Sequence, residues 1–407
     1  MNEKPPAEKN IPFFKPSFSE KEEEAVIRVI RSGWLTTGKE TLDFEREFSG
    51  YTGSPFSLAV NSASSGLLLA MEAFGVGSGK KILTTPYTFV STATSARHLN
   101  AEIVYADIEP DSYNIDPEKI ETVLRKDSSI AAIVPVHIAG EVCNMRAINE
   151  IASRFNVPVI EDSAHAFPAR TPDGLAGTLG DAGVFSFYAT KTITTGEGGM
   201  VCVRDSEKAD RIKIMRSNGI NRIVWDRYTN PDASWKYDVV DEGWKCNLPD
   251  ILAAIGRVQL TKADTFFKER KALAEMFNTA FSRCEFFQLP PDSPGNAWHL
   301  YLLRIVPEKL TIDRDDFMQI LREKGLGVSM HFIPHFEMSY FKDRYGLSKK
   351  DFPEADKKYR TTISLPFWPG MPEQTARRII DTVIETGNSI TGGAYDRNKK
   401  NKKQILQ

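Results

Sequence analysis

Short apolar runs alternate, along the first two thirds of the chain, with segments whose apolar residues recur at helical spacing. The runs are apolar on both faces, as in strands buried between two layers, and they occupy residues 57–60, 81–84, 103–106, 130–136 and 157–160. Helical spacing occurs at residues 65–74 and 146–155. This alternation predicts an α/β fold in which helices cover a mostly parallel central sheet.

Two further elements complete this part of the chain. Ser19 and Glu22 stand at the N-cap and N3 positions of a capping box, and the apolar spacing that follows predicts a helix ending near Gly33. The apolar runs at residues 183–188 and 199–203 are joined by a turn-rich connection. We expect these two runs to extend the sheet at its end.

The last third of the chain has a different pattern. Pro249 begins a long helix whose apolar spacing continues past Lys262 towards Phe277. After a proline-rich stretch we expect a strand, a helix, a strand and a final helix at residues 299–305, 313–323, 327–332 and 374–386. The sequence thus predicts a large α/β domain with an N-terminal arm over residues 1–270. A small α+β domain with a disordered basic tail is expected over residues 271–407.

The composition excludes several classes of protein. Of 407 residues 26% are charged, and 52 Lys and Arg against 54 Asp and Glu leave a net charge of -2, so no basic field attracts nucleic acid or an anionic membrane. Apolar stretches are too short to span a bilayer and the N-terminus is polar, so we expect a cytoplasmic protein. The four cysteines are scattered without metal-binding spacing, so we expect no metal site.

Two of the predicted strands are followed by charged side chains, and placing a charge in apolar surroundings requires an explanation. Asp162 follows the run at residues 157–160, at the edge where α/β sheets bind ligands, and Lys191 follows the run at residues 183–188. Loss of hydration lowers the pKa of a lysine and frees its nucleophilic amine. Pyridoxal phosphate requires such a lysine and a carboxylate on its ring nitrogen, an ion pair worth roughly 4 kcal/mol at an effective dielectric of about 20. On these two residues alone, a salt bridge or a solvated lysine is the favoured interpretation.

A third segment, residues 61–66, is rich in small hydroxyl side chains and opens the helix expected at residues 65–74. Small residues let a phosphate approach the backbone N–H groups at the positive end of a helix. An ordinary N-cap cluster explains the same residues equally well.

Three motifs together resemble the signature of the DegT/DnrJ-type nucleotide-sugar aminotransferases: EDSAHA at residues 161–166, GDAGVFSFYATK at residues 180–191 and TGEGGM at residues 195–200. Weaker matches extend the resemblance over about residues 11–388. The resemblance implies a pyridoxal-phosphate-dependent transferase of fold type I, the aspartate aminotransferase fold. Ser64 and Gly66 stand where this family usually has Thr and Ala, mild departures that leave phosphate binding in place.

The resemblance also assigns roles to residues within the motifs. Lys191 would bond to the cofactor aldehyde and, once released by the substrate, move a proton between substrate carbon and cofactor. Asp162 would pair with the ring nitrogen, and His165 would lie beside the phenolic oxygen. The phosphate and the ring face would be bound by Ser64, Ser65, Ser186 and Phe89. Without the motifs, His165 and Phe89 would be interpreted as packed core residues.

Asn247 lies in residues 243–248, a stretch similar to the loop that crosses into the partner's site in this family. The resemblance thus implies a homodimer with shared active sites, in which Asn247 reaches the cofactor phosphate of the other chain. An amide can donate to a phosphate oxygen without adding a second charge. The competing interpretation, an N-cap for the helix that Pro249 begins, is about equally favoured.

The resemblance implies transfer of an amino group, with glutamate as the expected donor, to a nucleotide-linked 4-keto-6-deoxy sugar for surface polysaccharide or amino-sugar biosynthesis. Amination at C4 is preferred over C3, without a physical reason in the sequence. Two alternatives are a sugar dehydratase or deoxygenase of the same fold and a non-catalytic pyridoxal-phosphate-binding regulator. Lys191 disfavours the first, because the dehydratases have histidine in its place. The absence of a DNA-binding segment disfavours the second.

Overall fold

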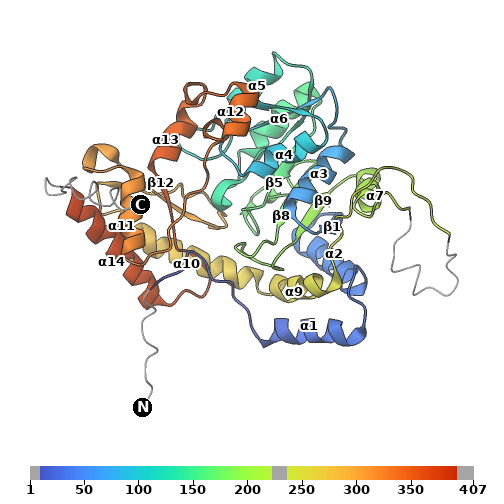
Figure 1. The fold of residues 1–407 in the computed structure, drawn as a ribbon, viewed down its shortest axis with the longest axis horizontal. Helices are drawn as coiled ribbons and strands as arrows, with labels where there is room; N and C mark the ends of the chain where they lie inside the picture. Colours follow the sequence, from blue (N-terminus) through green and yellow to red (C-terminus); the bar gives the residue numbers. More distant parts are fainter. Residues whose placement is uncertain (1–9, 222–235, 392–407) are drawn as a thin grey trace, which may run out of the picture.

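The structure is a computed structural model that describes residues 10–221 and 236–391 (Figure 1). The tail that the sequence predicts to be disordered and basic lies outside the described residues. The helices are α1 (Glu20–Ser32), α2 (Lys39–Thr52), α3 (Ala63–Ala73), α4 (Val90–His98), α5 (Pro117–Leu124), α6 (Met145–Phe155), α7 (Ser206–Met215), α9 (Asp250–Leu260), α10 (Ala263–Phe281), α11 (Arg314–Glu323), α12 (Ser339–Tyr345), α13 (Pro353–Thr361) and α14 (Glu373–Ile390). The strands are β1 (Phe56–Val60), β2 (Lys81–Thr84), β3 (Glu102–Tyr105), β4 (Ile130–Ile133), β5 (Ile160–Asp162), β6 (Arg170–Thr171), β7 (Gly174–Leu175), β8 (Ala182–Ser186), β9 (Gly199–Val203), β10 (Phe287–Gln288), β11 (Tyr301–Ile305) and β12 (Thr362–Leu365).

The central sheet has the strand order β1-β9-β8-β5 on one side and β4-β2-β3 on the other. Three backbone hydrogen bonds join the sides: Ile133 N donates to Pro158 O and Asp162 N donates to Pro135 O, both at 2.9 Å, and His137 N donates to Asp162 O at 3.1 Å. Strand β9 is antiparallel to its two neighbours, and the other neighbouring strands are parallel. The expected α/β fold with a mostly parallel sheet is therefore confirmed.

The positions of β8 and β9 differ from the expectation that they extend the sheet at its end. Strand β9 lies between β1 and β8, and all five of its residues are buried. The connection after β8 folds back, so that β9 pairs with β8 in antiparallel register, from Ala182 opposite Val203 to Ser186 opposite Gly199. Proximity along the chain thus predicted the pairing, but it could not predict that β1 would close the other side of β9.

Helix α3 packs unusually closely on this sheet. A Cβ atom at Gly66 would lie 2.7 Å from Val184 Cγ1, so a larger residue here would require the valine to shift. A Cβ atom at Gly199 would lie 2.9 Å from Ala63 N. Two glycines therefore bring the first turn of α3 down onto the ends of β8 and β9.

A second, smaller sheet of order β10-β11-β12 packs with α11 and α14 around its own buried cluster, away from α3 in Figure 1. Strand β12 was missed by the sequence analysis: its four residues, Thr362 to Leu365, alternate between polar and apolar side chains, and all four are buried. The strand expected at residues 327–332 is absent from the described elements, and only an isolated bridge between Ser329 and Ser364 forms there. Residues 327–332 instead lead into the cavity described below.

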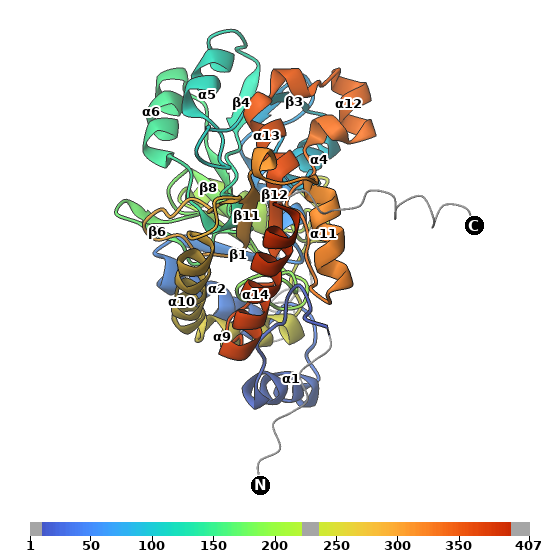
Figure 2. The ribbon, with the colours of Figure 1, turned by 90° about the vertical axis from the view of Figure 1, so that its left-hand side faces the viewer.

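The long helix expected after Pro249 is two helices, because α9 ends at Leu260 and α10 begins at Ala263. Both lie along one side of the molecule in Figures 1 and 2, with α1 next to α9. Helix α10 continues without a break through residue 270, so the domain boundary placed there stays a prediction. Helix α13 belongs to the expected small domain, but Glu354 N and Ala355 N donate to Asp107, directly after β3, at 3.0 and 3.1 Å.

The N-terminal arm connects the two parts of the molecule. Ile11 N donates to Gly325 O and Gly327 N donates to Ile11 O, both at 2.8 Å. The capping box of α1 forms as expected, with Ser19 N donating to Glu22 Oε2 at 2.9 Å, and Gly33 ends the helix with φ 73°. Among the helices of the described ranges, none combines the length and the apolar character needed to cross a membrane.

Candidate active site

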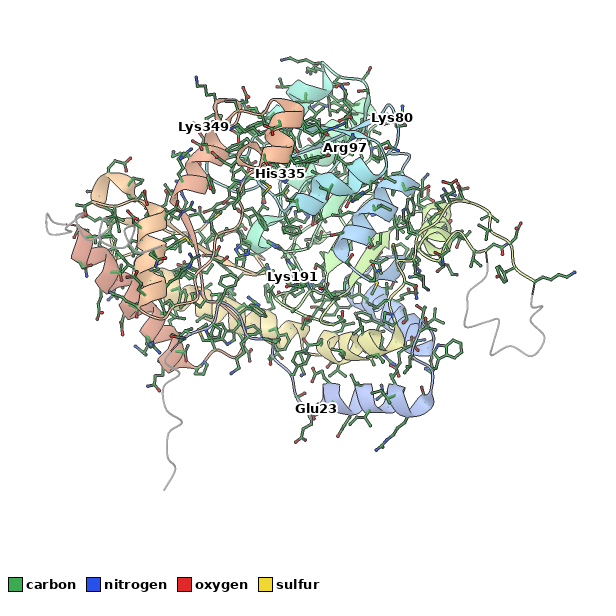
Figure 3. All side chains as sticks on the ribbon, viewed as in Figure 1. Glu23, Lys80, Arg97, Lys191, His335 and Lys349 are labelled. Carbon is green, nitrogen blue, oxygen red and sulfur yellow. The ribbon has the colours of Figure 1, made fainter. Side chains whose placement is uncertain are left out.

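A cavity of about 430 Å³ opens at the carboxyl ends of β5 and β8 and the start of α3, and it is closed on the other side by residues that follow α10. Lys191 lies near the centre of the molecule in Figure 3, whereas the labelled lysines Lys80 and Lys349 lie at its outer edge. Six of the eight residues predicted for the site line this cavity: Ser64, Phe89, Asp162, His165, Ser186 and Lys191. Ser65 and Asn247 do not line it.

Consecutive carboxylates on β5 have different surroundings. Asp162 lines the cavity, accepts a hydrogen bond from Thr92 Oγ1 at 2.7 Å and another from Ala164 N at 3.2 Å. Burial raises its pKa, although its hydrogen bonds and the nearby Lys191 and His137 act in the opposite direction. Glu161 points to the other face, fully buried, where it accepts from three backbone N–H groups, those of Gly177, Leu179 and Gly180, and bonds His137 Nε2. Asp162 is thus available to a ligand, whereas both carboxylate oxygens of Glu161 already accept hydrogen bonds within the protein.

Lys191 lies in the turn after β8, where its backbone N donates to Tyr188 O at 2.9 Å. Burial lowers the pKa of its amine from 10.5 to about 8, with Asp162 acting in the opposite direction. A shift of this size makes the neutral amine about 300 times more abundant near pH 7. Within the described residues Lys191 Nζ makes no hydrogen bond, so the amine is free to react at the cavity wall.

The start of α3 separates three neighbouring serines. Ser62 is the N-cap, and its Oγ accepts from Ser65 N at 3.1 Å and lies 3.0 Å from Ser65 Oγ. The ordinary N-cap interpretation therefore holds for Ser62 and Ser65. Ser64, one position earlier than Ser65, faces the cavity together with Ser186. Only the rotation of the helix decides which hydroxyl is free, and small residues alone do not predict it.

Asn247 does not cap the helix that follows it, and its role in a partner's site is untested within a single chain. Its Nδ2 donates to Thr37 Oγ1 at 2.7 Å, and its backbone pairs with Val60, immediately before the start of α3. The N-cap interpretation is wrong, because α9 has Pro249 at its N-cap position and no side-chain cap. Whether Asn247 reaches a partner's phosphate stays a prediction.

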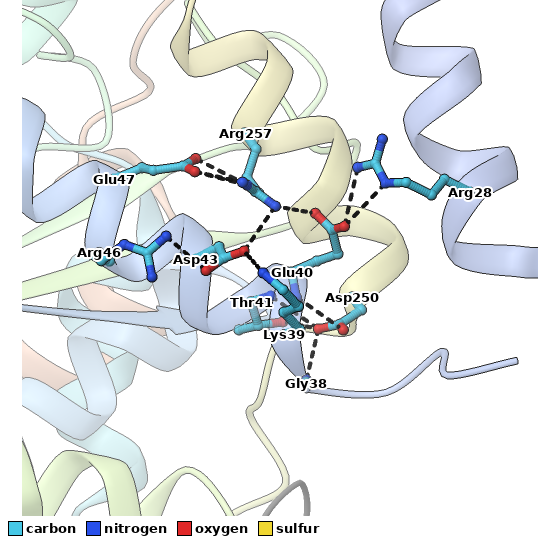
Figure 4. A network of polar contacts seen from close by, with 10 residues as sticks. All are labelled: Arg28, Gly38, Lys39, Glu40, Thr41, Asp43, Arg46, Glu47, Asp250 and Arg257. Atoms are coloured by element: carbon cyan, nitrogen blue, oxygen red, sulfur yellow. Dashed lines mark hydrogen bonds and ion pairs between the residues drawn. The ribbon is translucent and has the colours of Figure 1, made fainter. Parts of the chain in front are cut away.

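Asp250, next to this loop, caps a different helix. It accepts from Gly38 N at 2.7 Å, Thr41 N at 3.0 Å and Thr41 Oγ1 at 2.7 Å, so α9 supplies the cap of α2 (Figure 4). About two helical turns further on, Arg257 binds Glu47 and Glu40 of α2. The loop that carries Asn247 is therefore anchored on its C-terminal side, where α9 is fixed to α2.

The opposite wall of the cavity consists of aromatic and imidazole rings. His165 stacks on Phe332 with ring centroids 5.2 Å apart, and its centroid is 4.4 Å from that of His299. Ala139 N donates to His165 Nδ1 at 3.4 Å, which places the proton of the neutral ring on Nε2. Burial holds the pKa of His165 well below its usual value, with Lys191 and His331 adding to the effect. Phe89 lines this cavity and is 54% exposed, which leaves ring surface open for stacking.

Several residues of this wall were not singled out by the sequence. His299 and His331 line the cavity, as do Phe13 and Phe14 of the N-terminal arm. Of these, His331 alone belongs to one of the weaker matches to the family, His331 to Pro334. The others come from segments whose apolar pattern resembles ordinary core, so only long-range packing reveals them.

These residues fit pyridoxal phosphate. A buried carboxylate, an amine of lowered pKa, an open aromatic face and a helix start with free hydroxyls lie around one cavity. On an α/β sheet of this order, they define the class of pyridoxal-phosphate-dependent enzymes of fold type I.

Comparison with known proteins places the chain more closely. Residues 16–384 match the model of the DegT/DnrJ/EryC1/StrS aminotransferase family, and the chain belongs to that family. It is therefore a sugar aminotransferase by family, and its cofactor is pyridoxal phosphate.

Three relatives show the breadth of the similarity. The chain is 37% identical to the spore coat polysaccharide biosynthesis protein SpsC of Bacillus subtilis over 94% of this chain and 98% of that protein. It is similar in structure to Helicobacter pylori PseC, an aminotransferase involved in the biosynthesis of pseudoaminic acid, with 27% identity, a TM-score of 0.87 and coverage of 94% and 100%. The putative sugar aminotransferase Spr1654 of Streptococcus pneumoniae, in its PMP form, matches with 26% identity, a TM-score of 0.86 and coverage of 93% and 100%.

Proposed function

We propose that this enzyme transfers an amino group from glutamate to the keto group of a nucleotide-linked 4-keto-6-deoxy sugar, at C4 in preference to C3, for surface polysaccharide or amino-sugar biosynthesis. The observation that carries the proposal is the pairing of Lys191 and Asp162 in one cavity of a chain from a sugar aminotransferase family. The relatives named for spore coat polysaccharide and for pseudoaminic acid support the choice of pathway class. The preference for C4 has no support of its own and stays a prediction.

Bound pyridoxal phosphate supplies an electron-accepting ring that carries the amino group between two half-reactions. Asp162 holds a proton on the ring nitrogen, which keeps the ring electron-accepting. Lys191 moves the proton to and from the substrate carbon, a task suited to an amine with a pKa of about 8. His165 donates its Nε2 hydrogen to the phenolic oxygen. Ser64, Ser186 and the N–H groups at the start of α3 bind the phosphate.

Asn247 completes the site in a homodimer. The loop that carries it lies beside Val60, and its amide is engaged by the hydroxyl of Thr37 rather than by a charged group. An amide held in this way can turn to a phosphate of the neighbouring subunit at the loss of one neutral hydrogen bond, about 1 kcal/mol. We include the shared site in the proposed function.

The test is the glutamate half-reaction. Purified protein loaded with pyridoxal phosphate should lose its yellow absorbance when glutamate is added, with release of 2-oxoglutarate. A panel of nucleotide-linked keto-sugars should then restore the absorbance and yield an amino sugar, whose aminated carbon NMR identifies. Protein that stays yellow with glutamate and every other amino donor would support the non-catalytic alternative, and loss of a sugar hydroxyl without amination would support the dehydratase.

A further inference from the structure

His299 occupies a rigid position between the two parts of the molecule. The side chain is 4% exposed and lines the cavity beside His165. Its carbonyl accepts from Arg270 NH1 at 3.0 Å, and the preceding carbonyl accepts from the same NH1 at 3.1 Å. Leu300 N donates to Ala139 O at 3.2 Å. The ring is thus held in place by the backbone on both sides of it.

Neither ring nitrogen of His299 makes a hydrogen bond with another described residue. Within the described residues no hydrogen bond involves this ring, and Nδ1 is buried without a partner. An unpaired buried N–H is rarer in proteins than an unpaired acceptor. The proton of the neutral imidazole therefore belongs on Nε2, which gives the cavity wall a second N–H donor besides that of His165.

The charges around the cavity explain why a neutral donor matters. Among the described residues that line it, Lys191 is the one amine and no guanidinium is present. Arg270 lies behind His299, 2% exposed, where it donates to backbone carbonyls and lies 5.7 Å from the centroid of the Phe367 ring. Burial holds the pKa of His299 well below its usual value, and the positive charges of Lys191 and Arg270 act in the same direction. An anionic substrate group thus meets an imidazole N–H backed by a buried cation.

The other imidazoles have different partners. His165 Nε2 faces the phenolic oxygen in the proposed function, and His331 Nδ1 is 2.9 Å from Ser364 Oγ with its ring stacked on Phe13 at 5.4 Å. His299 is the ring of this wall that the described residues leave with both nitrogens unpaired.

We propose that His299 is a specificity-determining residue for the amino donor, and that its Nε2–H binds a carboxylate oxygen of the donor amino acid. The proposal rests on the proposed function in that the donor is an amino acid. It extends that function by naming the group that recognises the donor, in a cavity whose described lining lacks arginine.

The test uses glutarate, a dicarboxylate without an amine, titrated into the cofactor-loaded protein by calorimetry. His299→Phe keeps an aromatic ring and removes the donor, so we expect glutarate affinity to fall about ten- to a hundred-fold. His299→Gln retains an N–H and should stay within about five-fold of wild type. His98→Phe is the matched control, because His98 is exposed at the end of α4, away from the cavity.

Two readouts separate donor recognition from other roles. The affinity for pyridoxal phosphate and its visible circular dichroism should stay within about two-fold of wild type in both His299 variants. Equal glutarate affinity in wild type and His299→Phe, or no binding by the wild type, would overturn the proposal. Loss of the cofactor in step with glutarate would do the same and make His299 a cofactor residue. If glutamate fails to convert the wild type, the proposed donor is wrong, and the glutarate comparison still decides whether His299 binds carboxylate.

Discussion

The amines of Lys191 and Lys358 have similarly lowered pKa values, but they lie in very different surroundings. Burial lowers the pKa of each to about 8. Lys191 stands at the wall of a cavity, near Asp162, with its amine free of hydrogen bonds in the described structure. Lys358, on α13, is 1% exposed and packs over the ring of Tyr113, with Nζ 5.0 Å from the centroid. A lowered pKa alone therefore does not identify a reactive lysine. The amine must also be accessible to a ligand.

The largest expected effect separates the two lysines by chemistry. Lys191→Ala should lose the yellow cofactor band and detectable turnover, because no other amine of the described residues lines the cavity. Lys358→Met should keep both within about two-fold, because Lys358 reaches no ligand. Borohydride reduction followed by peptide mapping should fix the cofactor to a peptide that contains Lys191. Labelling of Lys358 instead would remove the basis of the comparison.

The next effect concerns the carboxylate beside Lys191. Asp162→Asn should keep the fold and reduce kcat about a thousand-fold, since a neutral amide forfeits an interaction of roughly 4 kcal/mol with the ring nitrogen. The folded-state pKa of Asp162 is raised, so its ionised form weakens the fold and the variant should be at least as stable at pH 7. Steady-state kinetics and urea unfolding measure the two quantities. Turnover within a few-fold of wild type would show that Asp162 is not the partner of the ring nitrogen.

Glu161→Gln is the matched control on the same strand. Glu161 accepts from three backbone N–H groups and bonds His137 Nε2, so an amide in its place leaves a donor facing a donor. We expect the free energy of unfolding to fall by about 3 kcal/mol, with kcat of the folded enzyme nearly unchanged. A large loss of kcat without loss of stability would show that Glu161 has a role in catalysis and is not only structural.

A smaller effect tests whether the cavity that contains Lys191 is completed by Asn247 of a second subunit. Asn247→Asp and Lys191→Ala homodimers should each be inactive, and an equal mixture after subunit exchange should regain about a quarter of wild-type activity, because half the dimers then hold one intact site. Native mass spectrometry should verify the exchange. Absence of recovery in verified mixed dimers would place the whole site within one chain.

The smallest effect is on stability alone. Lys358 has a folded-state pKa of about 8 against 10.5 in the unfolded chain, so only the unfolded chain keeps the proton between these values and stability rises with pH there. Lys191→Ala removes the other lysine whose pKa is lowered to about 8, so the difference between this variant and the double variant isolates the contribution of Lys358. Lys358→Met should abolish it and add up to about 3 kcal/mol at pH 7. Urea unfolding from pH 7 to pH 10.5 measures both, and an undiminished rise in the double variant would show that Lys358 is not its source.

The sequence predicted those parts of the site that sit at strand ends. Asp162 and Lys191 follow apolar runs, and the carboxyl edge of a parallel sheet brings such residues together whatever the loops do. Ser65 and Ser64 could not be told apart, because a rotation of 100° about α3 decides which one is buried in the cap. Strand β9 was paired correctly but misplaced, since its second neighbour lies about 140 residues away in the sequence.

The remaining part of the site could not be predicted. His299 lies just before β11, and nothing in the local pattern says that this strand end turns towards β5. Its place depends on contacts with α10 and with the loop at Ala139, which are segments far apart in the chain. Hydrophobic periodicity is a property of a single helix or strand. It therefore predicts which face of that element is buried, but not which other element packs against that face.

The cap of α2 has a consequence for the order in which the chain is made. The backbone N–H groups of Gly38 and Thr41 donate to the carboxylate of Asp250, which comes 212 and 209 residues later in the sequence. A ribosome that adds about 5 to 20 residues per second needs roughly 10 to 40 seconds to cover that distance. Throughout this interval the first turn of α2 has no acceptor for its N–H groups other than water. The N-terminal portion of the nascent chain therefore cannot complete the cap of α2 until Asp250 of α9 has emerged.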